Sequence, residues 1–556
     1  MKTHISKYIA IILIIGIVFN CSDNEFIDAD PVRLTVDEAL QNASVAEEMV
    51  YATYNAMLLG AYTGIHWIYA TTVPSDNAIA GVSGNNKNGN VIDGIEEING
   101  SLGSLNPVWT SHYSAITRAN YVLKFVPELD NVEDNLKELY IAEARFIRAM
   151  TYFRLLRVFG GVPLVDHILT PGDADDKIVA NVRVSKEELY EFIIDELTEV
   201  AAKLPTREEW DEAQLGRATS GAALGYLAKV YMYVSSDQQY NGLGEVNGKG
   251  SLENWSLCHQ ATLDVEALGY DLDFTYDKYG VNGGGPNMLA SVAWLVYAEN
   301  NVESVFEIQG NQGFANNAAP VINYYNWASS ERINLGVPSD EIVKLYEFSD
   351  RRLNATIVGK NNRAYFDLTG QGTAGTRLRY FDNRLAPNRE PYDFFCPKSY
   401  VTSNKNINPN AFNGQRNNKN IRTLRYADIL LIRAEAANEL GQTADAEATL
   451  NKIRLRAFGD NSHDYPTTDD INNILPGTGG DQLKSAIWRE RRLELAFEHD
   501  RWFDLARQGR REQVTNDYLE SRGMDRAYQS PKNDVFPIPI IQILLSSELL
   551  EQNPGY

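Results

Sequence analysis

Residues 424–457 read LRYADILLIRAEAANELGQTADAEATLNKIRLRA, and this stretch decides the fold class. Small and apolar residues recur every three or four positions over 426–440 and again over 443–457, which is the spacing of an α-helix. Only Gly441 and Gln442 separate the two segments. Two helices joined by so short a turn run antiparallel, and the many alanines allow close contact. The sequence therefore predicts an α-helical hairpin.

The same periodicity extends over much of the chain. Helical segments are predicted over about residues 35–59, 108–160, 185–233 and 424–508. Ser185 and Glu188 form a capping box that begins one helix, and Gly160 with Pro163 ends another. Alanine-rich hairpins resemble tetratricopeptide repeats, although no regular period of about 34 residues recurs. We therefore predict a mainly α fold, an irregular tetratricopeptide-like helical-repeat scaffold.

Three long stretches between the helices are rich in Gly, Asn, Tyr and Pro. They cover about residues 60–107, 235–339 and 359–420. Loops of this length in a compact protein usually carry function. We expect them to form a ligand-binding face on the helical scaffold, within one domain that spans residues 35–556.

The N-terminus has the pattern of an export signal. Lys2 and Lys7 precede an uncharged apolar run over residues 9–19, which is well short of the roughly 20 residues that span a bilayer. Cys21 follows this run, as in a bacterial lipobox. We therefore expect a lipoprotein signal peptide over residues 1–20 and lipidation of Cys21. Residues 21–34 would then form a polar tether.

Charge limits the set of partners. The 556 residues include 51 Lys and Arg against 74 Asp and Glu, which gives a net charge of -23. Such a chain repels nucleic-acid backbones and anionic lipid heads, so we expect no nucleic-acid partner and membrane attachment through lipid alone. The other cysteines, Cys258 and Cys396, lie far apart in sequence, and their pairing stays open at this point.

Five sequence blocks carry a family resemblance. They are AEARFIRAMTYFRLLRVFGGVPLV (142–165), GRATSGAALGYLAKVY (216–231), the hairpin 424–457, RERRLELAFEHDRWFDLAR (489–507) and FPIPIIQILLSSELLEQNPGY (536–556). In this order they resemble the SusD/RagB family of outer-membrane nutrient-binding lipoproteins. His499 stands where the family usually has Gly, which makes the local turn an open question.

The resemblance implies a lipid-anchored protein of the outer membrane that faces the cell surface. It would act as a lid on a SusC-like TonB-dependent transporter and bind oligosaccharides for import. Some members of the family take peptides instead, so a peptide-binding, RagB-like role is the first alternative. In that family the helical repeats face the transporter, and loops on the other side hold the ligand.

Motifs for catalysis are absent from the sequence. There is no His-Glu-x-x-His, no Cys-x-x-Cys and no Gly-x-Ser-x-Gly, so we predict no enzyme, no cofactor and no metal site. A secreted glycoside hydrolase remains the enzyme alternative, because 74 acidic residues offer many carboxylate pairs. Glu490, Glu494 and Glu498 lie on a predicted helix over 489–507, where i,i+3 arginines favour structural ion pairs.

Sugar recognition requires aromatic faces flanked by amide and carboxylate groups. Tryptophans on predicted helices, such as Trp109, are assigned to packing. The candidates for ligand contact are Trp67, Tyr69, Asp76 and Asn77 in the first long loop and Tyr324, Tyr325, Asn326 and Trp327 in the second.

Overall fold

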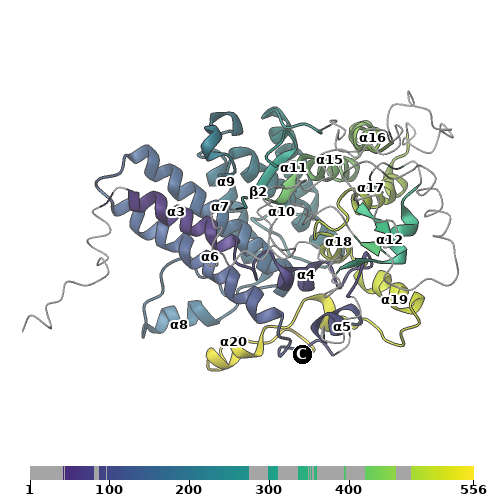
Figure 1. Ribbon diagram of the computed structural model, residues 1–556, viewed down its shortest axis with the longest axis horizontal. Coiled ribbons are helices and arrows are strands. Elements are labelled where there is room, and N and C mark those ends of the chain that lie inside the picture. The colour runs from purple at the N-terminus through teal and green to yellow at the C-terminus, as the bar shows by residue number, and fades with distance from the viewer. Residues whose placement is uncertain are drawn as a thin grey trace, which may run out of the picture.

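A computed structural model shows a mostly helical protein (Figure 1). It describes residues 42, 44–80, 87–95, 97–273, 299–310, 336–347, 350, 352, 356–359, 394–395, 420–458 and 477–556. The predicted signal peptide, Cys21 and the tether lie outside these residues, as does most of the third predicted loop. Within the part of the chain that is described, no helix is both long and apolar enough to cross a membrane.

The helices follow one another along the molecule. They are α3 (Ser44–Met57), α4 (Ile65–Thr71), α5 (Lys87–Asp93), α6 (Leu105–Phe125), α7 (Asp134–Phe159), α8 (Ala174–Asn181), α9 (Lys186–Ala201), α10 (Ser220–Tyr240), α11 (Ser251–Ala267), α12 (Asp340–Leu345), α15 (Tyr426–Glu439), α16 (Thr443–Phe458), α17 (Gly480–Glu494), α18 (Arg501–Arg507), α19 (Arg511–Ser521) and α20 (Ile540–Leu545).

Long helices pack in an array that starts with α3, α6 and α7 and continues through α9, α10 and α11 to α15. There α15 contacts both α16 and α17, at the opposite end of the molecule in Figure 1. Neighbours in this order share one large hydrophobic core, and a smaller core lies between α3, α6 and the first half of α7. The predicted mainly α fold is confirmed, and packing of successive helices is compatible with a helical repeat.

Several predicted helix boundaries are confirmed by their capping contacts. The Ser185 side chain accepts a hydrogen bond from the Glu188 amide at 3.1 Å and begins α9. Thr219 does the same for α10, where its hydroxyl accepts from Ala222 N at 3.0 Å. Gly441 takes a positive φ of 72° between α15 and α16, which allows the short turn of the predicted hairpin.

The predicted loops contain more helix than expected. Residues 60–107 include α4 and α5, and residues 235–339 include the end of α10 and all of α11. Trp255, Cys258 and Val265 of α11 are buried on one side of that helix. The loop prediction was wrong here because Gly- and Asn-rich segments on both sides of α11 hide its short apolar period.

The strands form small antiparallel pairs. They are β1 (Ala78–Ile79) with β3 (Val337–Pro338), β2 (Ser304–Ile308) with β6 (Ile421–Arg425) and β4 (Val358–Gly359) with β5 (Phe394–Phe395). The β2–β6 pair leads directly into α15, because Arg425 opposes Ser304 at the end of the ladder. These strands join distant segments to the helical array.

One predicted helix, over residues 489–507, is broken into α17 and α18. Phe497 has φ 64° and His499 has φ 71° in the connection. An α-helix cannot continue through left-handed residues, so the chain turns here. His499 Nδ1 lies 3.0 Å from the Thr71 hydroxyl and 2.7 Å from the Thr72 hydroxyl, contacts that hold this side chain in a conformation more typical of Gly.

Buried charges connect α17 to the strands and to α16. Glu494 is fully buried and accepts from Arg425 and Arg456, each at 2.6 Å. Arg425 also pairs with Glu303 of β2's approach at 2.7 Å, and Arg352 lies 3.2 Å from Glu494. We call these five residues the Glu494 cluster. The structural role predicted for Glu494 is therefore confirmed, with partners far outside its own helix.

A second set of buried charges joins α17 and α18 to α10 and α15. Arg491 pairs with Asp428 and, at 2.8 Å, with Asp504. Lys229 bridges Asp428 and Asp500 at 2.9 and 2.5 Å. Asp504 also pairs with Arg507 at 2.8 Å, the i,i+3 pair expected from sequence. The members of this Arg491 cluster are Lys229, Asp428, Arg491, Asp500, Asp504 and Arg507.

Removing a member of the Arg491 cluster should strongly destabilise the protein. Arg491→Met leaves buried carboxylates with too little positive charge, and we expect a loss of about 3–5 kcal/mol in the free energy of unfolding. Arg489→Met on the same helix is the matched control, because Arg489 is exposed and 3.8 Å from Glu347. It should cost less than about 1 kcal/mol. Urea denaturation of both variants measures the difference, and equal losses would contradict the argument.

Buried His499 should make the protein less stable in acid. Burial, together with nearby Arg154, lowers the pKa of His499 to about 3. Unfolding returns this pKa to about 6.5, so the unfolded chain binds the extra proton and stability falls as pH drops below about 6.5. The expected loss from this group is about 2 kcal/mol between pH 7 and pH 5.

His499→Asn removes the titrating group and keeps a residue that tolerates positive φ. The decrease in unfolding free energy between pH 7 and pH 5 should therefore shrink by about 2 kcal/mol in this variant. His167→Gln is the control with the opposite sign, because hydrogen bonds to Asp176 and Asp166 raise the pKa of exposed His167. An unchanged pH dependence in His499→Asn would show that His499 does not titrate on unfolding.

Candidate ligand-binding site

The first predicted contact residues lie in the protein interior. Trp67 and Tyr69 belong to α4, and Trp67 is only 2% exposed. The Arg154 guanidinium lies 3.6 Å from the centre of the Trp67 ring, and the His112 ring is 5.4 Å away. These neighbours pack Trp67 into the core, so its ring is not presented to solvent in this structure.

Asp76 and Asn77 follow α4 and are also buried. Arg501 contacts both oxygens of Asp76 at 2.8 and 2.9 Å, and Arg492 donates to Asn77 Oδ1 at 2.8 Å. Burial alone would raise the pKa of Asp76, but Arg501 and Arg492 outweigh it and hold this pKa below its usual value. Both residues therefore have structural partners on α17 and α18.

The second group of predicted contacts lies outside the described residues. It comprises Tyr324, Tyr325, Asn326 and Trp327, and ligand contact by these residues stays a prediction. Cys396 is likewise outside, whereas Cys258 is a buried free thiol that donates to the Ala228 carbonyl at 3.3 Å. Burial raises the pKa of the Cys258 thiol well above its usual value, which makes this group inert.

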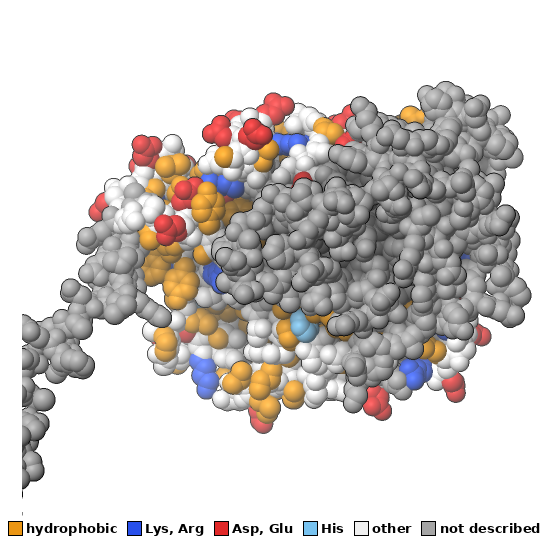
Figure 2. Space-filling model, viewed as in Figure 1, with side chains coloured by type: hydrophobic (Ala, Val, Ile, Leu, Met, Phe, Trp, Pro, Cys, Tyr) orange, Lys and Arg blue, Asp and Glu red, His pale blue; other side chains and the backbone are white. Residues whose placement is uncertain are grey.

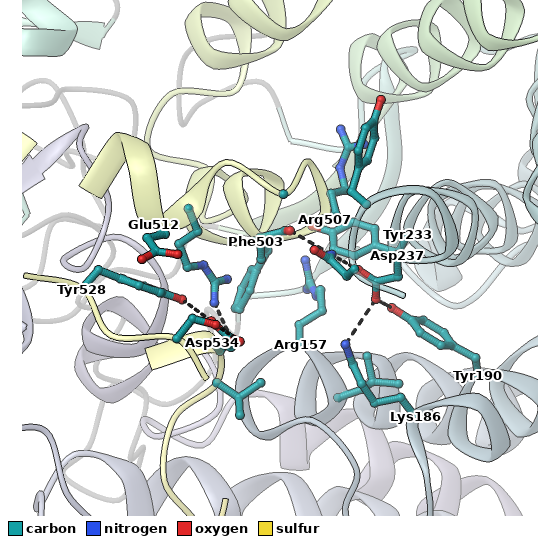
Figure 3. A pocket seen from close by; sticks show the side chains of 18 residues that line it. Arg157, Lys186, Tyr190, Tyr233, Asp237, Phe503, Arg507, Glu512, Tyr528 and Asp534 are labelled. Carbon is teal, nitrogen blue, oxygen red and sulfur yellow. Dashed lines mark hydrogen bonds and ion pairs between the residues drawn. The ribbon is translucent and has the colours of Figure 1, made fainter. Parts of the chain in front are cut away.

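A cavity of about 420 Å³ lies where five distant segments meet. The end of α7, the start of α9 and the last turns of α10 form one side, and α18, α19 and residues 528–535 form the other (Figure 3). Its volume is within the range of about 300–1,000 Å³ typical of small-molecule sites. This cavity is the candidate site.

Asp237 organises the α10 side of the cavity. Its carboxylate accepts from Tyr190 at 2.9 Å, from Lys186 at 3.4 Å and from Asn241 at 2.7 Å (Figure 3). Burial and the adjacent Asp237 raise the pKa of Tyr190 well above its usual value, so the phenol stays a donor. Lys186 is the adaptable member, because its side chain is partly exposed at the first turn of α9.

The opposite side is built on the segment that follows α19. The Tyr528 hydroxyl donates to the Asn533 carbonyl at 2.7 Å and to Asp534 at 3.1 Å. Ser530 donates to the other oxygen of Asp534 at 2.9 Å, and Arg511 donates to the Asp534 carbonyl at 2.6 Å. These contacts hold a tyrosine ring and a carboxylate at fixed positions across from Asp237.

Arg157, Tyr233 and Phe503 lie between the two sides (Figure 3). The Arg157 guanidinium is 4.6 Å from the Phe503 ring centre and pairs with Asp500 at 2.9 Å. Within the described residues, the buried Tyr233 hydroxyl and Arg157 Nε make no hydrogen bond of normal geometry. Burial, reinforced by Asp504, raises the pKa of Tyr233 to about 12. The Tyr233 phenol therefore remains protonated and keeps its capacity to donate a hydrogen bond.

The lining combines aromatic rings with charges of both signs. Cations and carboxylates nearly balance, which suits a neutral ligand with many hydroxyl groups better than an ion. Across the described ranges, no group of three or more His, Cys, Asp or Glu side chains is arranged to hold a metal ion. The charged and aromatic members are Arg157, Lys186, Tyr190, Tyr233, Asp237, Tyr240, Phe503, Arg507, Arg511, Glu512, Tyr528 and Asp534.

Sequence reasoning did not find this cavity. Residues 237–241 fell in a predicted loop, and Arg507 was assigned to an ion pair within its helix. No local motif marks the site, because its members come from segments up to several hundred positions apart. The Tyr-rich end of α10 is the one local signal that could have drawn attention to it.

Comparisons with known proteins agree with the architecture. A family model described as "SusD family" matches residues 269–556, more than half of the chain, and one described as "Starch-binding associating with outer membrane" matches residues 28–232. The chain is 24% identical to SusD-like protein P2 of Formosa agariphila over 99% of both chains.

Solved structures show the same fold. A SusD homologue from Bacteroides thetaiotaomicron has a TM-score of 0.73 at 23% identity, covering 94% of this chain and 99% of that one. Surface glycan-binding protein A from the same species, in complex with laminarihexaose, has a TM-score of 0.65 at 21% identity, covering 91% and 98%. With the fold, the ordered blocks and the family model in agreement, this chain belongs to the SusD family.

Proposed function

We propose that this protein is a lipid-anchored outer-membrane protein that binds oligosaccharides at the cell surface and delivers them to a SusC-like TonB-dependent transporter. Family membership and the Cys21 signal support the location and the transporter partner. Laminarihexaose bound to a protein of the same fold supports a glucan as the first ligand to test. The protein acts by binding, without chemistry on the sugar.

The aromatic, charge-balanced cavity is the observation that carries the proposal. A sugar ring offers flat CH faces and hydroxyls on its edge, and the cavity supplies tyrosine rings beside Lys186 and Asp237. One stacked ring that hides roughly 60 Å² of CH surface gains about 1.5 kcal/mol. Two or three such contacts give weak, reversible binding, which is sufficient when a tethered protein keeps the ligand near a pore.

Lys186→Met tests the cavity directly. Loss of one charged hydrogen-bond donor should weaken oligosaccharide binding by about 1.5–3 kcal/mol, or roughly ten- to hundredfold. Lys203→Met is the matched control, because Lys203 lies just beyond the other end of α9 and pairs with Glu199 at 2.8 Å. Isothermal titration calorimetry with lipid-free protein and laminarihexaose, within a wider glycan panel, measures both variants.

Other results would redirect the proposal. If Trp327→Ala abolishes binding while Lys186→Met does not, the ligand is held by the second long loop and not by the cavity. Binding of peptides in place of every glycan would favour the RagB-like alternative. Reducing ends released from the bound glycan during incubation would establish a hydrolase and overturn the binding role.

A further inference from the structure

The short helix α20 presents an apolar face to solvent. Leu544 and Leu545 are 64% and 72% exposed, and Ile540, Ile541 and Leu549 are also exposed. No residue of α20 is buried. Residues 540, 541, 544 and 545 lie on one side of the helix because they are spaced by one, three and four positions. We call these five residues the α20 patch, which forms apolar surface at the lower edge of the molecule (Figure 2).

The α20 patch is held in a fixed position. The Ile540 amide donates to the Gly100 carbonyl at 2.8 Å, and Gln542 donates to Asn106 at 2.8 Å. A Cβ added at Gly100 would lie 2.7 Å from the Ile538 carbonyl oxygen, so the chains touch closely here. A rigid apolar helix needs no ordering when a partner binds, and this favours association.

Acidic side chains surround the patch. Glu548 and Glu551 are exposed just beyond α20. On the neighbouring helix α8, Asp175 is exposed, with Lys177 carrying the opposite charge (Figure 1). The two regions are joined by Arg183, which follows α8 and donates to the Glu551 carbonyl at 3.3 Å and to Asn553 at 2.6 Å.

The charges select among the occupants of such a patch. Two copies of this chain would bring their glutamates together, and an anionic lipid surface would repel them. Large exposed apolar patches mark either protein or membrane contacts, and here the acidic rim disfavours the membrane. A protein surface with an aliphatic centre and a Lys- or Arg-rich rim is complementary to both features.

We propose that the α20 patch is the docking surface for such a protein, and that this protein is the transporter named under the proposed function, on which the inference rests. The contact involves the C-terminal segment of the chain, whereas the family resemblance alone implied the helical repeats. Its apolar centre stabilises the complex, and its acidic rim sets the orientation.

Photocrosslinking in native outer membranes tests the contact. A benzoylphenylalanine at Leu544 of the full lipidated chain should crosslink to a TonB-dependent transporter, at an aliphatic segment flanked by Lys or Arg when mapped by mass spectrometry. The same probe at Leu252, an exposed leucine on α11, is the control and should not give this product. Crosslinks from position 544 to a second copy, to lipid or to nothing would overturn the proposal.

Two charge variants sharpen the test. Leu544→Glu with Leu545→Glu should reduce the transporter recovered with the tagged protein by about tenfold or more, whereas Leu252→Glu should not. Glu548→Lys with Glu551→Lys should also weaken this association, but would strengthen binding to anionic phosphatidylglycerol vesicles if the patch met the membrane instead. Unchanged recovery in both variants would overturn the proposal.

Glycan binding by the same purified variants separates the two proposals. The α20 variants should bind laminarihexaose as the parent protein does, because α20 contributes no residue to the cavity. A parent protein that binds no glycan would contradict the proposed function. Parent protein that binds glycan while its α20 variants still associate with the transporter would contradict only the docking surface.

Discussion

Buried arginine–carboxylate pairing around α17 is the constraint on which the rest of the structure depends. Arg491 and Glu494 lie one turn apart and face two separate sets of partners, one on α10 and α15 and the other on β6 and α16. Each ion loses its water on burial, which costs several kcal/mol unless the partners are all in place. The helices must therefore meet in one arrangement, because any other would leave a charge unpaired in the core.

This network also shapes the candidate site. Arg507 lines the cavity and is held by Glu435 at 2.7 Å, while Arg157 is held by Asp500 of the Arg491 cluster. Their charges are already neutralised by the protein, so they contribute position and aromatic stacking rather than attraction for an anion. The groups left for a ligand are the neutral Tyr233 phenol and the partly exposed Lys186, which is consistent with a polyhydroxylated ligand.

Ligand capture and docking use different parts of the molecule. The cavity lies among α7, α9, α10, α18 and α19, whereas the α20 patch depends on contacts with residues 100–106 and adjoins α8. Because the two surfaces share no residue, glycan chemistry could vary without altering the docking contact. Such separation suits a family in which a common fold serves many nutrients.

Sequence alone determined the helical class, the capped boundaries of α9 and α10 and the α15–α16 hairpin, because helix periodicity and capping are local. It also carried the five blocks that identify the family. Only the tertiary structure decided that Trp67 and Asp76 are buried, that the predicted 489–507 helix breaks at His499, and that Arg157, Asp237 and Tyr528 meet at one cavity. Those outcomes depend on which distant side chains neutralise a buried charge or cover a ring, and no periodicity along the chain encodes such pairings.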